Sequence, residues 1–175
     1  MRRPIISGGR RIVAGVAALL VLTLAAAAQL ASEAVEPTPV PAGAPDHQFS
    51  AGRATEILAD IADQPRPLGS QAHDRVRDEL ADRLTDLGFD TDIESGVGGA
   101  HFEDETVIGK VDNVVGTLPG TDPTGHLLLV THYDSVPSGP GAADAGMPVV
   151  SILEAVRALL ADGNPRNDLT VVFSD

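Results

Sequence analysis

The chain has 175 residues, a net charge of −13 and no cysteine, which allows about one domain besides a membrane segment and excludes disulfides and thiolate metal ligands. The acidity argues against nucleic acid and anionic lipid surfaces as partners, because both are themselves negatively charged. A metal site in this chain would therefore use His and carboxylate side chains, a set that suits zinc, manganese or magnesium.

An uncharged apolar stretch, residues 12–28, directly follows two arginines at positions 10 and 11. As a helix it would be roughly 26 Å long, near the lower limit for crossing a bilayer. The basic flank, residues 1–11, is expected to stay in the cytoplasm, so that the following chain is exported. We favour a signal anchor over residues 12–30. A cleaved signal peptide, which would give a secreted protein, and a buried core helix are the alternatives.

A segment rich in proline and alanine, residues 31–46, follows without an apolar period and predicts an extended spacer. We place the start of the soluble domain at His47, so that the domain spans residues 47–175. The predicted localisation is a single-pass membrane protein with this domain on the extracytoplasmic side.

Two amphipathic helices are expected at the start of the domain. The first spans residues 49–62, with Ser50 as its cap. The second begins after Ser70, carries an apolar stripe and ends before Gly88. His73, in the first turn of the second helix, is interpreted as a surface residue.

The next part of the chain alternates between short apolar runs and turn residues. The Gly-rich residues 95–100 predict a loop, and His101 with its acidic neighbours is interpreted as part of that loop region and not as a site. Residues 119–125 contain Pro-Gly and Asp-Pro pairs, which predict a hairpin turn or a loop. We expect strands at residues 89–94, 106–111, 113–118, 127–131 and 169–173, and a helix at residues 147–161.

The order of strand, helix and strand over residues 127–173 predicts a βαβ unit. The fold class is therefore α/β, with a mostly parallel central sheet and helices on both faces. Sites in open α/β sheets lie at the carboxyl ends of the strands. His132, Asp134 and Asp144 follow one strand and a Gly/Pro loop, so we expect them at that end of the sheet.

The three side chains suit a metal site. His132 and Asp134 are two positions apart, so they point to the same side of an extended chain, as a His ligand and the carboxylate that orients it would. A carboxylate that bridges two metal ions must be held firmly, and the tight loop before Asp144 provides such support. The alternative interpretation is an exposed strand end, with a satisfied His and an Asp that caps a turn or helix.

These residues lie within longer runs that together resemble the co-catalytic di-zinc aminopeptidase family. That family includes aminopeptidase Y, glutamate carboxypeptidase and the endoplasmic reticulum metallopeptidase branch, and the membrane segment makes the last branch the most similar. The resemblance covers roughly residues 47–175. The runs that carry it are NVVGTLPG at 113–120, LLLVTHYD at 127–134, GPGAAD at 139–144, LEAVRAL at 153–159 and DLTVVF at 168–173.

The resemblance implies that His132 is a zinc ligand, that Asp134 is the catalytic acid that orients it, and that Asp144 bridges two zinc ions. It implies a zinc-exopeptidase-like fold and an exopeptidase that removes terminal residues from peptides by means of a metal-activated water. Family members carry a Glu-Glu pair just after the last predicted strand, and later an Asp and a His. None of these follows within the 175 residues. We therefore expect an incomplete N-terminal fragment that holds zinc loosely or not at all and is inactive alone.

One local departure from the family lies after Asp144, where Met147 and Pro148 replace the usual small residues. The truncation predicts that residues 169–173 lack their later neighbours in the sheet and expose apolar surface prone to aggregation.

A second hypothesis is a catalytically dead, membrane-associated binding or interaction module with an acidic surface. An unrelated hydrolase or nucleotide-binding domain is disfavoured, because the sequence has no G-x-S-x-G, no P-loop and no G-x-G-x-x-G after a strand. The expected partners are a peptide substrate and, through the N-terminal helix, the membrane, but no nucleic acid.

Overall fold

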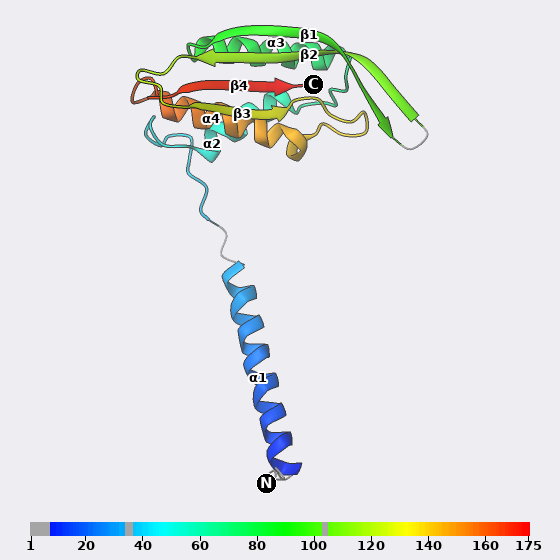
Figure 1. The fold of residues 1–175 in the computed structure, drawn as a ribbon, viewed down its shortest axis with the longest axis vertical. Coiled ribbons are helices and arrows are strands. Elements are labelled where there is room, and N and C mark those ends of the chain that lie inside the picture. The colour runs from blue at the N-terminus through cyan, green and yellow to red at the C-terminus, as the bar shows by residue number, and fades with distance from the viewer. Residues whose placement is uncertain (1–7, 34–36, 103–104) are drawn as a thin grey trace. The chain divides into compact units, whose positions relative to one another are not determined.

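The computed structural model describes residues 8–33, 37–102 and 105–175, as Figure 1 shows. Arg2 and Arg3 of the predicted basic flank, and Glu103 and Asp104 beside His101, lie outside the described residues. The chain divides into two compact units, Met1–Thr38 and Pro39–Asp175.

The first unit contains one helix, α1 (Gly8–Glu33). Within it, the 19 residues Ile12–Leu30 are long and apolar enough to cross a membrane, and none of them is buried against other parts of the protein. The hydroxyl of Thr23 donates to the carbonyl of Leu19 at 2.8 Å, so the one polar group in mid-helix is satisfied within the helix. The helix therefore has the length and composition required of a membrane span, and the signal anchor over residues 12–30 stays a prediction.

The second unit contains three helices over the residues predicted to be helical. The side chains of Ser50 and Ser70 accept hydrogen bonds from the N–H groups three residues later, as predicted for helix caps. Gly88 has φ of +90°, a conformation that glycine adopts without strain, and it ends the second of these helices. The helices are α2 (Ala51–Ile61), α3 (Gln71–Asp86) and α4 (Met147–Leu160).

The sheet has four strands in the order β1-β2-β4-β3 (Figure 1). The strands β3 and β4 are parallel, and with α4 they form the predicted βαβ unit. The sheet is mixed where a mostly parallel one was predicted, because β2 is antiparallel to both β1 and β4. The strands are β1 (Asp90–Phe102), β2 (Glu105–Leu118), β3 (His126–His132) and β4 (Asp168–Ser174).

The strands β1 and β2 form one long hairpin, which corrects two predictions. Residues 95–100 belong to β1 and not to a loop, and the two strands expected within residues 106–118 are one continuous strand. The glycines fit a ladder here, since a Cβ on Gly98 would lie 2.8 Å from the Cγ1 of Val111 on the opposite strand. His101 is likewise a strand residue, with Nδ1 lying 2.9 Å from the hydroxyl of Thr106 across the ladder.

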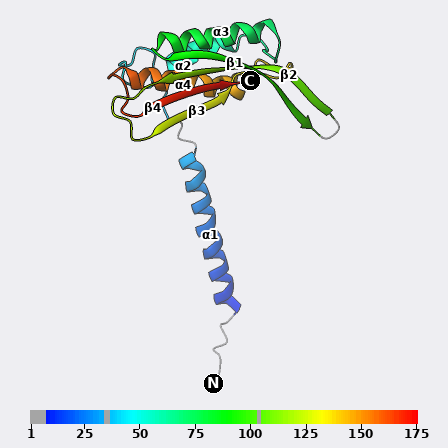
Figure 2. The ribbon, with the colours of Figure 1, turned by 45° about the horizontal axis from the view of Figure 1, so that its top comes forward.

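All three helices of this unit pack on one face of the sheet, as Figures 1 and 2 show. Helix α3 comes close to β2, because a Cβ on Gly116 would lie 3.0 Å from the Cδ1 of Leu84. On the opposite face Leu128 and Val130 remain 56% and 54% exposed. Helices on both faces, as predicted, are therefore not seen among the described residues. The buried hydrophobic side chains of the strands on the helix face are those of Val114, Leu118, Leu169, Val171 and Phe173.

Strand β4 lies inside the sheet, paired with β2 on one side and β3 on the other. The expectation that residues 169–173 lack sheet neighbours is therefore wrong. The exposed apolar surface belongs to β3, which is an edge strand of this sheet. The predicted hairpin at residues 119–125 is also excluded in favour of the loop, because β2 and β3 are not neighbours.

The compact unit begins at Pro39, whereas the sequence placed the start of the domain at His47. The physical reason is the guanidinium of Arg53 on α2. Its Nη1 donates to the carbonyls of Ala42 at 2.6 Å and Ala44 at 2.9 Å, and its Nη2 donates to the carbonyl of Gln48 at 2.6 Å. The segment before α2 is thereby held against the domain.

We expect the V171T substitution to lower the free energy of unfolding by about 2 kcal/mol, because it places a hydroxyl in a site that is 0% exposed. The same chemical change on the open face, V130T, should stay within about 0.5 kcal/mol. Tyr133 is the only tyrosine and the chain has no tryptophan, so tyrosine fluorescence during urea unfolding reports on this domain. Equal losses in the two variants would contradict the one-sided core.

Candidate functional site

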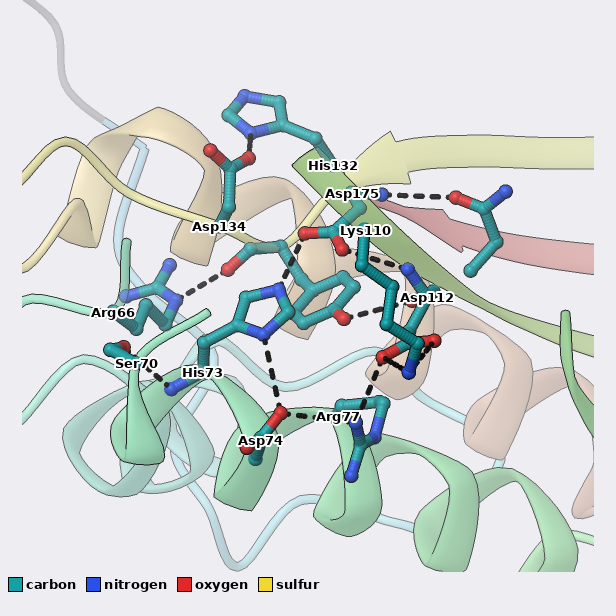
Figure 3. Close-up of polar contacts among 12 residues, drawn as sticks. Arg66, Ser70, His73, Asp74, Arg77, Lys110, Asp112, His132, Asp134 and Asp175 are labelled. Atoms are coloured by element: carbon teal, nitrogen blue, oxygen red, sulfur yellow. Dashed lines mark hydrogen bonds and ion pairs between the residues drawn. The ribbon is translucent and has the colours of Figure 1, made fainter. Parts of the chain in front are cut away.

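The structure brings together the three residues predicted to form the site, at the carboxyl end of β3. The Nδ1 of His132 lies 2.8 Å from an oxygen of Asp134, and its Nε2 lies 3.0 Å from an oxygen of Asp144. Each ring nitrogen of His132 therefore faces one carboxylate. Figure 3 shows His132 and Asp134 side by side at this strand end.

The site is open to solvent and negatively charged. The side chain of His132 is 42% exposed and that of Asp144 is 91% exposed. Partial burial of the imidazole works against its charged form, but hydrogen bonds to Asp134 and Asp144 outweigh this and raise the pKa of His132. The pair of carboxylates thus favours a cation at this position, either a proton on His132 or a metal ion.

Asp144 lies in a single irregular turn, η1 (Ala142–Gly146), that leads into α4. The turn is closed by the N–H of Gly146, which donates to the carbonyl of Gly141 at 2.9 Å. Gly141 has φ of +61°, and a Cβ there would lie 2.5 Å from the carbonyl oxygen of Asp144. This position therefore requires glycine. The Asp144–Ala145 peptide bond is cis.

The residues that depart from the family after this turn do not prevent the helix from starting. Helix α4 begins at Met147, and Pro148 stands in its first turn, where a missing N–H leaves no bond unmade.

Arg66 holds the loop that connects β3 to this turn. It lies in the run PRPLGS at 65–70, which also resembles the family, but the sequence alone predicted no role for it. It is 0% exposed. Its Nε donates to the carbonyl of Tyr133 at 2.5 Å, its Nη2 donates to that of Gly141 at 3.2 Å, and its Nη1 donates to that of Pro140. The backbone N–H of Arg66 also donates to the hydroxyl of Ser135 at 2.9 Å. One side chain thus supports both ends of the loop between the two carboxylates.

The position of Arg66 carried a weak sequence signal. It stands between Pro65 and Pro67, so its backbone is restricted before folding. Burial lowers the pKa of the guanidinium, although Asp134 and Asp63 oppose this effect. An arginine nevertheless keeps its charge at any ordinary pH, so a fixed positive charge lies beneath the acidic site.

His73 is buried, which corrects its interpretation as a surface residue. It is 2% exposed, its Nε2 lies 2.5 Å from an oxygen of Asp175, and its ring stacks on Tyr133 with centroids 4.7 Å apart. A signal was present in the sequence, since His73 precedes Val76 by three residues and so extends the apolar stripe of α3 toward its N-terminus.

A network of polar groups connects this histidine to the base of the hairpin (Figure 3). The second oxygen of Asp175 accepts from the N–H of Asp112 at 2.8 Å, and the Tyr133 hydroxyl donates to the carbonyl of Asp112 at 2.8 Å. Hydrogen bonds from Ser95, and then from Lys110 and Arg77, lower the pKa of Asp112 to about 2. Burial raises the pKa of the Tyr133 phenol, which therefore stays protonated.

The donor set fits part of a zinc site. Two ligands of a tetrahedral zinc ion lie about 3.3 Å apart, and Nε2 of His132 and the facing oxygen of Asp144 are 3.0 Å apart. A carboxylate oxygen of Asp134 contacts the other ring nitrogen, Nδ1, as a carboxylate beside a metal-binding His usually does. Within residues 8–33, 37–102 and 105–175, however, no group of three or more His, Asp or Glu side chains is arranged to hold a metal ion. The described residues therefore supply two ligands at most.

Comparison with the sequences of known proteins also supports a peptidase family. Residues 113–175 match the model of Peptidase family M28. The protein named vacuolar membrane protease from Candida albicans is 38% identical over 123 residues, which cover 67% of this chain and 14% of that protein. The chain thus spans about 14% of the length of this curated relative. The match confirms the family resemblance inferred from the motifs.

Solved structures confirm the α/β fold class. The glutaminyl cyclase of Porphyromonas gingivalis has a TM-score of 0.63 and 26% identity, over 74% of this chain and 46% of that chain. A Zn-dependent exopeptidase from Parabacteroides distasonis has a TM-score of 0.57 and 24% identity, over 74% of this chain and 47% of that chain.

We expect R66K to lower the free energy of unfolding by about 3 kcal/mol, because a lysine cannot reach three carbonyls at once and would leave buried acceptors without donors. R75K is the matched control, since Arg75 is 42% exposed and pairs with Asp63 on the surface. Urea unfolding followed by circular dichroism measures both. A loss in R66K no larger than in R75K would refute a supporting role for Arg66.

The depressed pKa of Asp112 predicts a pH-dependent stability. A carboxylate with a folded-state pKa of about 2 stabilises the fold above its ordinary pKa of 3.8, and this contribution disappears as the pH falls through about 2. The difference in unfolding free energy between the wild type and D112N should therefore shrink as the pH is lowered from 5 to 2. A difference that stays constant over urea titrations in this range would contradict the assignment.

Proposed function

Because residues 113–175 belong to peptidase family M28, we propose that this chain carries part of the catalytic centre of a zinc-dependent exopeptidase. A hydrolase that acts on peptides is the assignment that the family supports directly. Removal of residues from a peptide terminus, as an aminopeptidase, is the finer proposal. It goes beyond what the names of the relatives state.

The observation that carries the proposal is the arrangement of one carboxylate at each ring nitrogen of His132. In this proposal Nε2 of His132 and an oxygen of Asp144 bind zinc, and Asp134 orients the His132 ring through its contact with Nδ1. The carboxylate of Asp134 holds the proton of His132 on Nδ1, so the lone pair that binds zinc is on Nε2. The same hydrogen bond increases the basicity of Nε2.

Zinc, when bound, would act as a Lewis acid toward the scissile carbonyl and would activate water for attack. The residues of this chain contribute by position. Asp144 has its side chain almost wholly in solvent, so it can reach a second ion as well as the first, as the proposed two-ion site requires. The loop held by Arg66 keeps the carboxylates of Asp134 and Asp144 on opposite sides of the imidazole.

We also propose that the 175-residue chain is inactive by itself and holds zinc loosely. Catalytic zinc sites have three protein ligands, and His132 and Asp144 are the two proposed here. No general base has been assigned among the described residues. The chain spans about 14% of the length of its Candida albicans relative. We therefore propose peptidase activity only for a longer protein that contains this chain.

The proposed location is a membrane, with α1 as a single span and the domain on the extracytoplasmic side. Ile12–Leu30 has the length and composition for such a span. If the segment were cleaved as a signal peptide, the domain would be secreted instead.

The test is zinc binding by the whole chain in detergent, measured by isothermal titration calorimetry. D144N should weaken zinc binding at least about tenfold, because it removes a charged ligand. D122N is the matched control, since Asp122 is 81% exposed and pairs with Arg166 away from the site. Undiminished zinc affinity in D144N would remove Asp144 from the metal site.

Release of leucine from an aminoacyl anilide tests the accompanying proposal of inactivity. The chain alone, loaded with zinc, is expected to release none. Turnover that disappears in D144N would show instead that these residues suffice for catalysis.

A further inference from the structure

We propose that His73 is a positioning residue for the metal site, acting through Asp175 and Tyr133 on the strand end that carries His132. The inference rests on the proposed zinc site and adds a residue of α3 to its support. His73 itself does not contact His132, Asp134 or Asp144 in the interactions described above.

The first step is the buried pair of His73 and Asp175. Their side chains are 2% and 0% exposed, and Nε2 lies 2.5 Å from the carboxylate. Asp175 follows the end of β4, so a residue of the helix layer is bonded directly to the carboxyl edge of the sheet. The other carboxylate oxygen accepts from the N–H of Asp112, and the N–H of Asp175 donates to the side chain of Asn113 at 3.1 Å. The end of β4 is therefore fixed to both α3 and β2.

The second step is Tyr133, which stands between His132 and Asp134 in the chain. Its N–H donates to the carbonyl of Ser174 at 3.0 Å, and its carbonyl accepts from Arg66. Its hydroxyl donates to the carbonyl of Asp112. The polar groups of this residue thus all have partners, and its ring, which is 0% exposed, lies against the ring of His73.

Asp175 and Tyr133 follow the two strand ends that pair with each other, those of β4 and β3. Ser174 is the register partner of His132 in the β3/β4 ladder, and Asp175 follows Ser174 directly. A shift of Asp175 would move Ser174, and a shift of the tyrosine ring would move the backbone on both sides of it. His73 limits both movements, so it limits the directions in which the His132 imidazole can point.

A histidine at position 73 has a cost that an apolar residue would avoid. Nδ1 of His73 is buried and has no hydrogen-bond partner among the residues that the structure describes, since the carboxylate of Asp74, drawn beside it in Figure 3, is 3.8 Å away. An unsatisfied buried nitrogen costs stability, whereas an apolar side chain would continue the stripe of α3 without that cost. Departures of this kind from good packing are typical of functional sites. The bond from Nε2 to Asp175 is the gain that an apolar residue would not provide.

The test compares H73F, H73Q and the control E154Q in the whole chain in detergent, with zinc alone as the ligand. H73F keeps a ring to stack on Tyr133 but removes the donor to Asp175, while H73Q places an amide donor near the position of Nε2. Glu154 is also 0% exposed, but it bonds to Arg53, Arg157 and the N–H of Ser50, away from Tyr133. E154Q therefore reports the effect of lost stability alone.

We expect H73F to weaken zinc binding about tenfold, as loss of an outer support of a metal ligand does, and H73Q to restore it to within about threefold of the wild type. E154Q should lower the melting temperature and leave zinc affinity unchanged. Affinities are compared at a temperature at which circular dichroism shows each variant to be folded.

Zinc affinity in H73F equal to that of the wild type would overturn the inference and leave His73 as a packing residue only. If H73F does not fold, H73N takes its place, because asparagine is too short to supply a donor at Nε2, and unchanged affinity there has the same meaning. A wild-type chain that binds no zinc would refute the proposal that this chain holds zinc, and the positioning role with it. The two failures can be told apart, because unchanged zinc affinity in H73F can be observed only if the wild-type chain binds zinc.

Discussion

The arrangement of the candidate site depends on the hydrogen bonds that the buried guanidinium of Arg66 donates to backbone carbonyls. Between β3 and α4 the chain runs through an irregular segment of glycine, proline and serine, which has no ladder of its own to hold it. Arg66 replaces that ladder with a fork of donors to the carbonyls of Tyr133, Pro140 and Gly141. A fully buried positive charge is expensive unless every donor is satisfied, so the loop and the arginine each require the other.

The site also depends on strand order. Because β4 lies between β2 and β3, the carboxyl end of β4 meets both the end of β3 and the base of the hairpin. Asp175 uses this position to contact His73 from the helix layer and Asp112 from β2. An antiparallel placement of β3 would have put His132 at the opposite edge of the sheet, so the parallel β3/β4 pair is what brings the histidine to this edge.

Local patterns in the sequence were sufficient for the helices, for strands β3 and β4, and for the contact between His132 and Asp134. Caps at Ser50 and Ser70, the βαβ order and the spacing of His132 and Asp134 all report on neighbours within a few residues. What the sequence did not reveal depends on distant partners. Arg66 is explained by residues about 70 positions away, and His73 by one 102 positions away. The Gly-rich part of β1 has no apolar period, and only the facing strand shows why it is extended.

The β1–β2 hairpin has a further consequence. From Gly99 to Phe102 and from Glu105 to Ile108 its residues pair with one another. Val97 and Ile108, one on each strand of the hairpin, are 80% and 71% exposed. Because these two side chains already face solvent, we expect their amides to exchange through a local opening of low free energy, whereas the amides of β4, which lies inside the sheet, exchange only on global unfolding. The protein thus combines a buried strand at the centre of the sheet, next to the candidate site, with outer hairpin strands whose ladder can open without disturbing that centre.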